Sequence, residues 1–270
     1  MVLSTDPIFF SIGPIHIYYY GLVYALTFLV LYLVFTYTKK KHLLNQDQID
    51  SLFLHILIGM LVGGRVMHFL FADPTVFITS PLELLYIWHG GMSFFGAFLG
   101  IVVGVALFVR RNKLSVERFF ICADSIALVA TLGLIFGRMA NFLNQELVGR
   151  VTDAVPWCVE FGRMCSVNIS GEVVQTLCYA GCRHPYQIYA SISHAILFVV
   201  LVFVYRRHGA KVGETFWAFI FGYCISRFVV DFWRDDAIIA IGLTSWQIVS
   251  LVVFVTSIFL YRHFVRHKRA

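Results

Sequence analysis

Charge is scarce in this sequence. Only 13% of the 270 residues are Asp, Glu, Lys or Arg, whereas 59% are hydrophobic, and the mean hydropathy is +0.80. A soluble globular domain usually carries about 25% charged residues, so the composition excludes a water-soluble globule and predicts a polytopic membrane protein. The net charge of +6 follows from where the basic residues lie along the chain and does not indicate a nucleic-acid partner.

Long apolar runs occupy most of the chain. Seven of them are long enough to cross a bilayer: about 18–38, 50–71, 90–109, 117–137, 186–205, 213–232 and 244–262. They predict an all-α integral membrane protein with seven transmembrane helices, in which residues 1–270 form a single polytopic domain. The first run lacks a basic segment before it and a clear small-residue cleavage site, so we expect no cleavable signal peptide.

Basic residues alternate between the predicted loops. Fourteen of the 21 lysines and arginines follow the first, third, fifth and seventh runs. Because basic residues accumulate on the cytoplasmic side of a membrane, this pattern predicts a cytoplasmic C-terminus and an N-terminus outside. The other seven are arginines in the outer loops or outer halves of the runs, and they need a pairing or functional explanation: Arg65, Arg138, Arg150, Arg163, Arg183, Arg227 and Arg234.

Internal repeats are lacking, and so is a lysine in the last run. The two halves of the chain have no matching motifs, which argues against a transporter built from inverted repeats. The absence of a lysine between Thr244 and Arg262 excludes a retinal-binding protein, which needs a lysine for its Schiff base. A lipid-binding receptor would leave the arginines unexplained, and a channel would need polar residues along the full depth of the bundle. Here the polar residues concentrate in the outer half, which favours an enzyme site at the depth of lipid headgroups.

The long outer loop, at about 138–185, contains four of the six cysteines: Cys158, Cys165, Cys178 and Cys182. Two disulfides are favoured because oxidation is permitted outside the cytoplasm, and the sequence leaves three pairings open. A metal site is the alternative, although the spacing of Cys158 and Cys165 is poor for zinc. We expect no metal and no cofactor.

A first polar cluster lies where the fourth run ends. Arg138, Asn141 and Asn144 follow one another at intervals of three and share one face of a helix. Glu146 comes next and is a candidate to orient an arginine. A helix end with Arg138 extended toward water and Asn144 as a cap is the plainer alternative. A charge at membrane depth costs roughly 2.5–3.5 kcal/mol on insertion scales, and the planar guanidinium fork fits phosphate, so we favour a buried site for a phospholipid headgroup.

The sixth run carries a second polar stripe, formed by Tyr223, Arg227, Asp231 and Arg234. Arg227 and Asp231 are four residues apart and can form an ion pair, which explains how the charge is tolerated but not why it is there. Arg65 in the second run is a candidate to face the same cavity. At the start of the fifth run, Gln187 and His184 are candidates to line the site, and a capping role explains His184 equally well.

The segment from Gly137 to Gly149 resembles the signature G-R-x-G-N-F-x-N-x-E-x-x-G of the prolipoprotein diacylglyceryl transferases of bacterial inner membranes. The resemblance extends over nearly the whole chain through separate motifs in the same order: Tyr19 to Tyr24, Gly64-Arg65, Gly90 to Gly96, Arg183 to Tyr189, and Gly222 to Arg234. The chain therefore looks like a divergent member of that family.

The resemblance implies an activity on the outer side of the bacterial inner (cytoplasmic) membrane. Diacylglyceryl would pass from phosphatidylglycerol to the thiol of the lipobox cysteine in a preprolipoprotein signal peptide, so phosphatidylglycerol, that signal peptide and membrane lipid are the implied partners. Arg138 and Arg227 correspond to the two essential arginines of the family, and Tyr20, Asn141 and Gly149 fall on positions that matter there. We expect Arg138 and Arg227 to bind phosphate and one of them to favour the thiolate.

The chain departs from the family at the start of the third run. The family has S-F-H-G there, with a histidine often proposed as the base for the thiol, and this chain has Phe95 in its place. His89, His184 and Tyr20 are the candidate replacements. A paralogue that acts on another acceptor, or a non-catalytic membrane protein that binds phospholipid or lipoprotein, is the alternative.

Two sets of site residues follow from the motifs and the resemblance. The predicted catalytic residues are Arg138, Arg227, Tyr20, His89 and His184. The predicted substrate-binding residues are Arg65, Asn141, Asn144, Glu146, Gly149, Gln187, Tyr223, Asp231 and Arg234.

Overall fold

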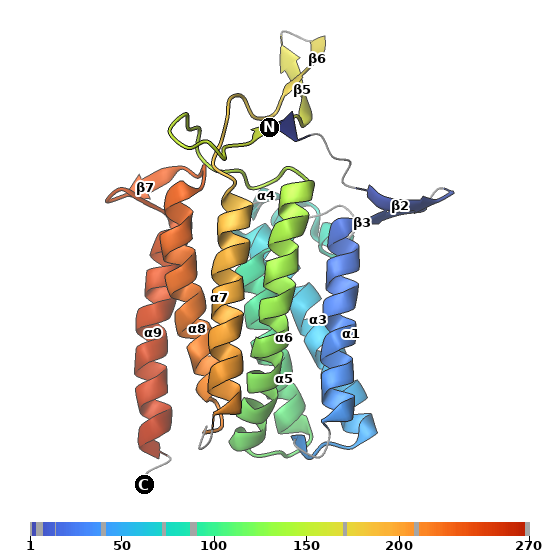
Figure 1. The fold of residues 1–270 in the computed structure, drawn as a ribbon. Coiled ribbons are helices and arrows are strands. Elements are labelled where there is room, and N and C mark those ends of the chain that lie inside the picture. Colours follow the sequence, from blue (N-terminus) through green and yellow to red (C-terminus); the bar gives the residue numbers. More distant parts are fainter. Residues whose placement is uncertain are drawn as a thin grey trace. The chain divides into compact units, whose positions relative to one another are not determined.

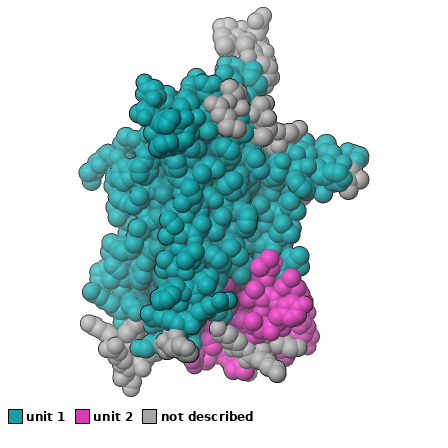
Figure 2. Space-filling model, in the orientation of Figure 1, with its two compact units in different colours: residues 1–29, 127–270 teal, residues 30–126 magenta. Residues whose placement is uncertain are grey.

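A computed structural model describes residues 2–3, 8–13, 15–38, 42–71, 74–86, 91–169, 172–207 and 211–267. The chain forms two compact units, which Figure 2 shows in different colours: residues 1–29 together with 127–270, and residues 30–126. The single polytopic domain that the sequence suggests stays a prediction.

Helices dominate the described residues (Figure 1). The long ones are α1 (Tyr19–Tyr37), α3 (Gln46–Phe71), α5 (Phe94–Arg111), α6 (Val116–Leu143), α7 (Tyr186–Arg206), α8 (Glu214–Val230) and α9 (Ser245–His267). All of them except α5 are counted, within the described residues, among six helices that are long and apolar enough to cross a membrane. The protein is therefore an all-α, multi-pass membrane protein, and the seventh span and the orientation of the termini stay predictions.

Short elements connect or flank these helices. They are α4 (Pro74–Thr79), the 3-10 helices η1 (Pro81–Leu85) and η3 (Asp231–Trp233), and the strands β1 (Val2–Leu3), β2 (Ile8–Ile12), β3 (Ile15–Tyr18), β4 (Glu160–Phe161), β5 (Met164–Ile169), β6 (Glu172–Leu177), β7 (Ile238–Ala240) and β8 (Leu243–Thr244). The strands pair only two by two: β1 is parallel to β4, while β2 with β3, β5 with β6 and β7 with β8 are antiparallel.

Helix α6 ends later than the sequence predicts. The apolar run predicts an end near residue 137, whereas the helix continues to Leu143, so the loop that the sequence places outside begins after Leu143 and not at about residue 138. Hydropathy falls at Arg138, but helical hydrogen bonding does not stop there, since the amide of Asn144 donates to the carbonyl of Ala140 at 2.8 Å. Arg138 and Asn141 therefore lie on the last turns of a helix.

Helices α6 to α9 pack against one another in chain order within the first unit. The hydroxyl of Ser191 on α7 donates to the carbonyl of Ile135 on α6 at 3.2 Å. Helix α8 contacts both α7 and α9. The side-chain amide Nε2 of Gln247 on α9 donates to the backbone carbonyl of Phe228 on α8 at 3.0 Å. The end of α6, the start of α7 and the end of α8 meet at one end of this unit (Figure 1).

Two disulfides hold the segment between α6 and α7. Cys158 is bonded to Cys182, and Cys165 to Cys178, with Cα atoms 5.4 Å and 5.0 Å apart. The second bond links Cys165 on β5 to Cys178, the residue directly after β6. Disulfides are thus confirmed, one of the three possible pairings is selected, and the alternative of a zinc site built from these four thiols is wrong.

Helices α3 and α5 of the second unit approach each other through glycines. A Cβ added at Gly59 would overlap the carbonyl oxygen of Gly100, and one added at Gly63 would overlap that of Gly96. Small residues at intervals of four allow helices to come this close in a membrane, where van der Waals packing drives association.

Candidate functional site

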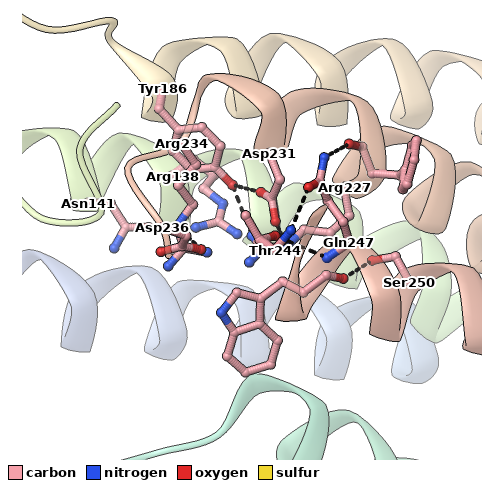
Figure 3. Close-up of polar contacts among 12 residues, drawn as sticks. Arg138, Asn141, Tyr186, Arg227, Asp231, Arg234, Asp236, Thr244, Gln247 and Ser250 are labelled. Atoms are coloured by element: carbon pink, nitrogen blue, oxygen red, sulfur yellow. Dashed lines mark hydrogen bonds and ion pairs between the residues drawn. The ribbon is translucent and has the colours of Figure 1, made fainter. Parts of the chain in front are cut away.

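A buried ion pair and a tyrosine form the centre of the site. The Nε of Arg227 on α8 lies 3.1 Å from Oδ2 of Asp231, the first residue of η3, and these side chains are 8% and 0% exposed. Tyr186, the first residue of α7, donates its hydroxyl to Oδ1 of Asp231 at 2.6 Å and accepts from Nη1 of Arg227 at 2.9 Å. Each of the three groups therefore contacts the other two (Figure 3).

Two further guanidinium groups lie over the ring of Tyr186. The Cζ atoms of Arg138 and Arg234 are 5.8 Å and 5.6 Å from the ring centroid, within the distance of about 6 Å at which a ring face attracts a guanidinium. Figure 3 shows the side chains of both arginines close to the tyrosine. Arg138, Arg227 and Arg234 are called the arginine cluster below.

Carboxylates do not balance the charge of the arginine cluster. Arg227 is paired with Asp231, and the Nε of Arg234 lies 3.1 Å from Oδ2 of Asp236. Arg138 has no carboxylate partner among the described residues and donates to Oδ1 of Asn141 at 3.4 Å. Three guanidinium groups against two carboxylates leave one net positive charge, which at membrane depth favours the binding of an anion.

The ion pair beyond the end of α8 is partly shielded from water. Burial raises the pKa of Asp236 above its usual range, and the neighbouring Arg234 opposes this rise. Burial lowers the pKa of Arg234, and repulsion from Arg227 lowers it further, although a guanidinium stays charged at any physiological pH. Reduced access of water strengthens the attraction of the Arg234 guanidinium for an anion.

Backbone contacts join the segment after α6 to the end of α8. Gly149 forms an isolated bridge with Arg234, and the amide of Arg150 donates to the carbonyl of Trp233 at 2.9 Å. A Cβ added at Gly149 would overlap the carbonyl oxygen of His184 and lie 2.8 Å from that of Trp233. The predicted site residue Gly149 is thus a point of close backbone approach, which places Arg234 beside the cluster.

The carboxylate of Glu146 is the centre of a second group of polar side chains. Tyr20 on α1 donates to its Oε2 at 3.4 Å, Asn144 donates to its Oε1 at 3.3 Å, and Nη1 of Arg163 lies 3.9 Å from the same Oε1. Glu146 therefore pairs with Arg163, whereas the sequence left open which arginine it would orient. Gln187 donates to the backbone carbonyl of Glu146 at 2.6 Å, which joins this group to the helix that carries Tyr186.

Other predicted site residues have different neighbours. The Nδ1 of His184 lies 3.2 Å from the hydroxyl of Tyr189. Tyr223 is buried on α8, one turn before Arg227, and its ring stacks on that of His194 with centroids 5.8 Å apart.

Two predicted residues belong to the second unit. Arg65 is 2% exposed, and its guanidinium donates to the carbonyls of Leu84 at 3.3 Å, Gly91 and Tyr86, both at 3.1 Å, and also to that of Glu83. Backbone carbonyls of its own unit therefore hold this charge. His89 lies outside the described residues.

Sequence reasoning did not single out several residues of the site. Tyr186 lies inside the Arg183 to Tyr189 motif, but no role was assigned to it, because tyrosine is common in this aromatic-rich chain. Arg183 was one of the seven unexplained arginines, and its Nη1 donates to Oδ2 of Asp235 at 2.6 Å and to the carbonyl of Gly149 at 3.1 Å. The two acidic residues directly after Arg234, Asp235 and Asp236, could have indicated the ion pairs of Arg183 with Asp235 and of Arg234 with Asp236.

The fold and the site together define a multi-pass membrane protein with a positively charged, anion-binding group of side chains at one end of its helices. The chain belongs to the prolipoprotein diacylglyceryl transferase family: the family model with the description "Prolipoprotein diacylglyceryl transferase" matches residues 7–263. It is therefore an enzyme of the transferase class, as the resemblance predicts.

Relatives from several bacteria carry the name phosphatidylglycerol–prolipoprotein diacylglyceryl transferase. The chain is 34% identical to that of Rhodospirillum rubrum over 96% of this chain and 92% of the relative. It is 32% identical to that of Wolbachia pipientis and 34% identical to that of Bordetella parapertussis, each over 96% of this chain and 95% of the relative.

Proposed function

We propose that this protein transfers diacylglyceryl from phosphatidylglycerol to the thiol of the lipobox cysteine in a preprolipoprotein. The names of the relatives state this donor and a prolipoprotein acceptor, which supports the transferase over a paralogue with another acceptor or a non-catalytic binding protein. The observation that carries the proposal is the net positive charge of the arginine cluster.

The cluster suits the phosphate of the donor lipid. A phosphodiester headgroup carries one negative charge and presents oxygens that a guanidinium fork can bind in pairs. We assign Arg138 and Arg227 to this phosphate, with Arg234 beside them over the ring of Tyr186. Asn141, which bonds Arg138, would hold that guanidinium in place.

An apolar groove on the helix that carries Arg227 is suited to a fatty acyl chain of the donor. It has a volume of about 120 Å³ and lies between α8 and α9, lined by Cys224, Ile225, Phe228, Val229, Ser250, Leu251 and Phe254. Arg227 lies on the same helix at the same level as four of the lining residues, so we assign the groove to an acyl chain of the lipid whose phosphate the cluster binds.

The proposed reaction forms one bond and breaks one. The sulfur of the acceptor cysteine bonds to the terminal glycerol carbon of the diacylglyceryl group, and the bond between that carbon and the phosphate oxygen breaks. Glycerol phosphate leaves with the electron pair of the broken bond, so negative charge grows on the phosphate. Guanidinium groups that are already in place, in a site poor in water, stabilise such charge as it develops.

The acceptor thiol must lose its proton, because the thiolate is the nucleophile and a free cysteine has a pKa of about 8.5. A guanidinium without a carboxylate partner lowers the pKa of a nearby thiol, and Arg138 is the member of the cluster that we assign to this role. His184, bonded to Tyr189, is the described candidate for the proton acceptor, and Tyr20, which donates to Glu146, can pass a proton on to that carboxylate.

We further propose seven spans in the bacterial inner membrane, with the N-terminus outside and the C-terminus in the cytoplasm. The placement of 14 of the 21 basic residues supports this orientation. Disulfides form outside the cytoplasm, so the bonds at Cys158 and Cys165 support an outer location for the segment after α6. The arginine cluster lies at that end of its unit.

The transfer assay uses purified protein in detergent with phosphatidylglycerol and a lipobox peptide. Mass spectrometry should detect a diacylglyceryl group on the peptide cysteine. Arg138→Ala should lower the rate by about 100-fold or more, since one preorganised donor to a developing anion is worth roughly that factor, with no loss of expression.

Arg262→Ala, an exposed arginine on α9, is the matched control and should transfer at the wild-type rate. Transfer by Arg138→Ala at the wild-type rate would refute the assignment of that residue. Absence of transfer by the wild-type protein, while a relative is active in the same assay, would refute the proposed function.

A further inference from the structure

Tyr186 contacts all three members of the arginine cluster. Its ring lies under the guanidinium groups of Arg138 and Arg234, and its hydroxyl accepts from Arg227 and donates to Asp231. It is uncharged and only 1% exposed. We propose that Tyr186 is a positioning residue that sets the relative placement of the three guanidinium groups, an inference that rests on the proposed function.

The ring of Tyr186 offsets the repulsion between the positively charged guanidinium groups of Arg138 and Arg234. Arg138 comes from α6 and Arg234 from the segment after η3, and without a bound anion their guanidinium groups repel each other. An aromatic ring has a negative face that attracts both. The ring therefore keeps two cations near the same point while the phosphate is absent, which lowers the cost of assembling the site when phosphate arrives.

The hydroxyl of Tyr186 fixes the third guanidinium. It accepts from Nη1 of Arg227 at 2.9 Å, while Oδ2 of Asp231 lies 3.1 Å from Nε of the same arginine. The hydroxyl also donates to Oδ1 of Asp231 at 2.6 Å, which orients that carboxylate. One edge of the Arg227 guanidinium is thus hydrogen-bonded to Tyr186, and another lies in an ion pair with the carboxylate that Tyr186 orients.

Ring and hydroxyl should affect different kinetic parameters. The ring acts on the placement of Arg138 and Arg234 before the lipid binds, so its loss should raise KM for phosphatidylglycerol as well as lower kcat. The hydroxyl acts on the orientation of Arg227 toward charge that grows during the reaction, so its loss should lower kcat with little change in KM.

Two variants separate the contributions. Tyr186→Phe keeps the ring and removes the hydroxyl, and should lower kcat by about 10-fold with KM within about 3-fold of the wild type. Tyr186→Leu removes both, and should lower kcat by about 100-fold and raise KM by about 5-fold or more. Tyr205→Phe makes the same chemical change elsewhere on α7 and is the control.

Each preparation is also melted with and without phosphatidylglycerol, which tests positioning without turnover. The proposal predicts that the lipid raises the melting temperature of the wild type and of Tyr205→Phe more than that of Tyr186→Leu. Wild-type kcat and KM in both Tyr186 variants would overturn it. The proposal would also be overturned if the Tyr186 variants melted at a lower temperature but kept wild-type kcat and KM per folded molecule, because that result means a purely structural role.

Failure of the proposed function gives a different result. The wild type and Tyr205→Phe would then both lack transfer activity, and the lipid-dependent melting shift would still decide whether Tyr186 positions the cluster for an anionic lipid. An equal shift in all four proteins would overturn the positioning role.

Discussion

Replacing Asp231 by asparagine should destabilise the protein because it leaves a buried guanidinium without a carboxylate. The Asp231 side chain is 0% exposed, and that of Arg227, 3.1 Å away, is 8% exposed. Asp231→Asn keeps the size of the side chain and an oxygen that can still accept from Tyr186. Its main effect is therefore the loss of one negative charge beside Arg227.

The size of this effect follows from the burial of the pair. Removal of one partner from a buried ion pair costs about 3–5 kcal/mol, and for a chain of this size 1 kcal/mol shifts the melting temperature by about 2–4 °C. Asp231→Asn should therefore melt about 6–20 °C below the wild type. Phosphatidylglycerol should recover part of the loss, because its phosphate offers Arg227 another negative charge.

Thermal unfolding in detergent, with and without phosphatidylglycerol, is the assay. Asp153→Asn, in an exposed position, is the matched control and should melt within about 1 °C of the wild type, as surface substitutions usually do. The double variant Arg227→Gln with Asp231→Asn should recover most of the stability without activity, since neither charge remains. A single variant Asp231→Asn that melts like the wild type would show that Arg227 does not depend on this carboxylate.

Two further predictions concern the segment between α6 and α7. Gly149→Ala should lower the melting temperature and the transfer rate, because a Cβ there overlaps the carbonyl of His184. Gly137→Ala, with open space around it inside α6, should melt at or slightly above the wild-type temperature. Replacing Cys158 and Cys182 by serine opens a loop with a sequence separation of 24 and should cost about 3 kcal/mol. It should also lower the transfer rate, because Arg183 follows Cys182 and bonds Asp235. The same change at the Cys165–Cys178 bond of the β5–β6 hairpin should lower the melting temperature without lowering the rate of transfer. Equal rates in both cysteine variants would contradict this reasoning.

Charges in apolar runs were the strongest signal in the sequence. Arg138, Arg227 and Asp231 are identifiable without coordinates, because a charge at membrane depth is retained only when a partner or a function offsets its cost. The structure places these residues around one tyrosine. The ion pair of Arg227 with Asp231 is confirmed as the four-residue spacing predicts.

The rest of the site depends on contacts between distant segments. Tyr186 is one of 13 tyrosines, and its membership of the Arg183 to Tyr189 motif does not reveal its contacts with Arg227 and Asp231, which follow from its place at the start of α7. The end of α6 was misplaced because hydropathy records the arrival of polar side chains and not the end of helical hydrogen bonding. The disulfide pairing needed the positions of four Cα atoms, which spacing along the chain does not supply.

The central claim is that the arginine cluster holds the phosphate of the donor lipid. Native mass spectrometry of the purified protein, offered equal amounts of phosphatidylglycerol and diacylglycerol, tests this most directly because the two lipids differ in the phosphate-containing headgroup. We predict that the wild type and Arg262→Ala retain phosphatidylglycerol in preference to diacylglycerol, and that Arg138→Ala loses this preference. An unchanged preference in Arg138→Ala, or no preference in the wild type, would show that the arginine cluster does not hold this phosphate.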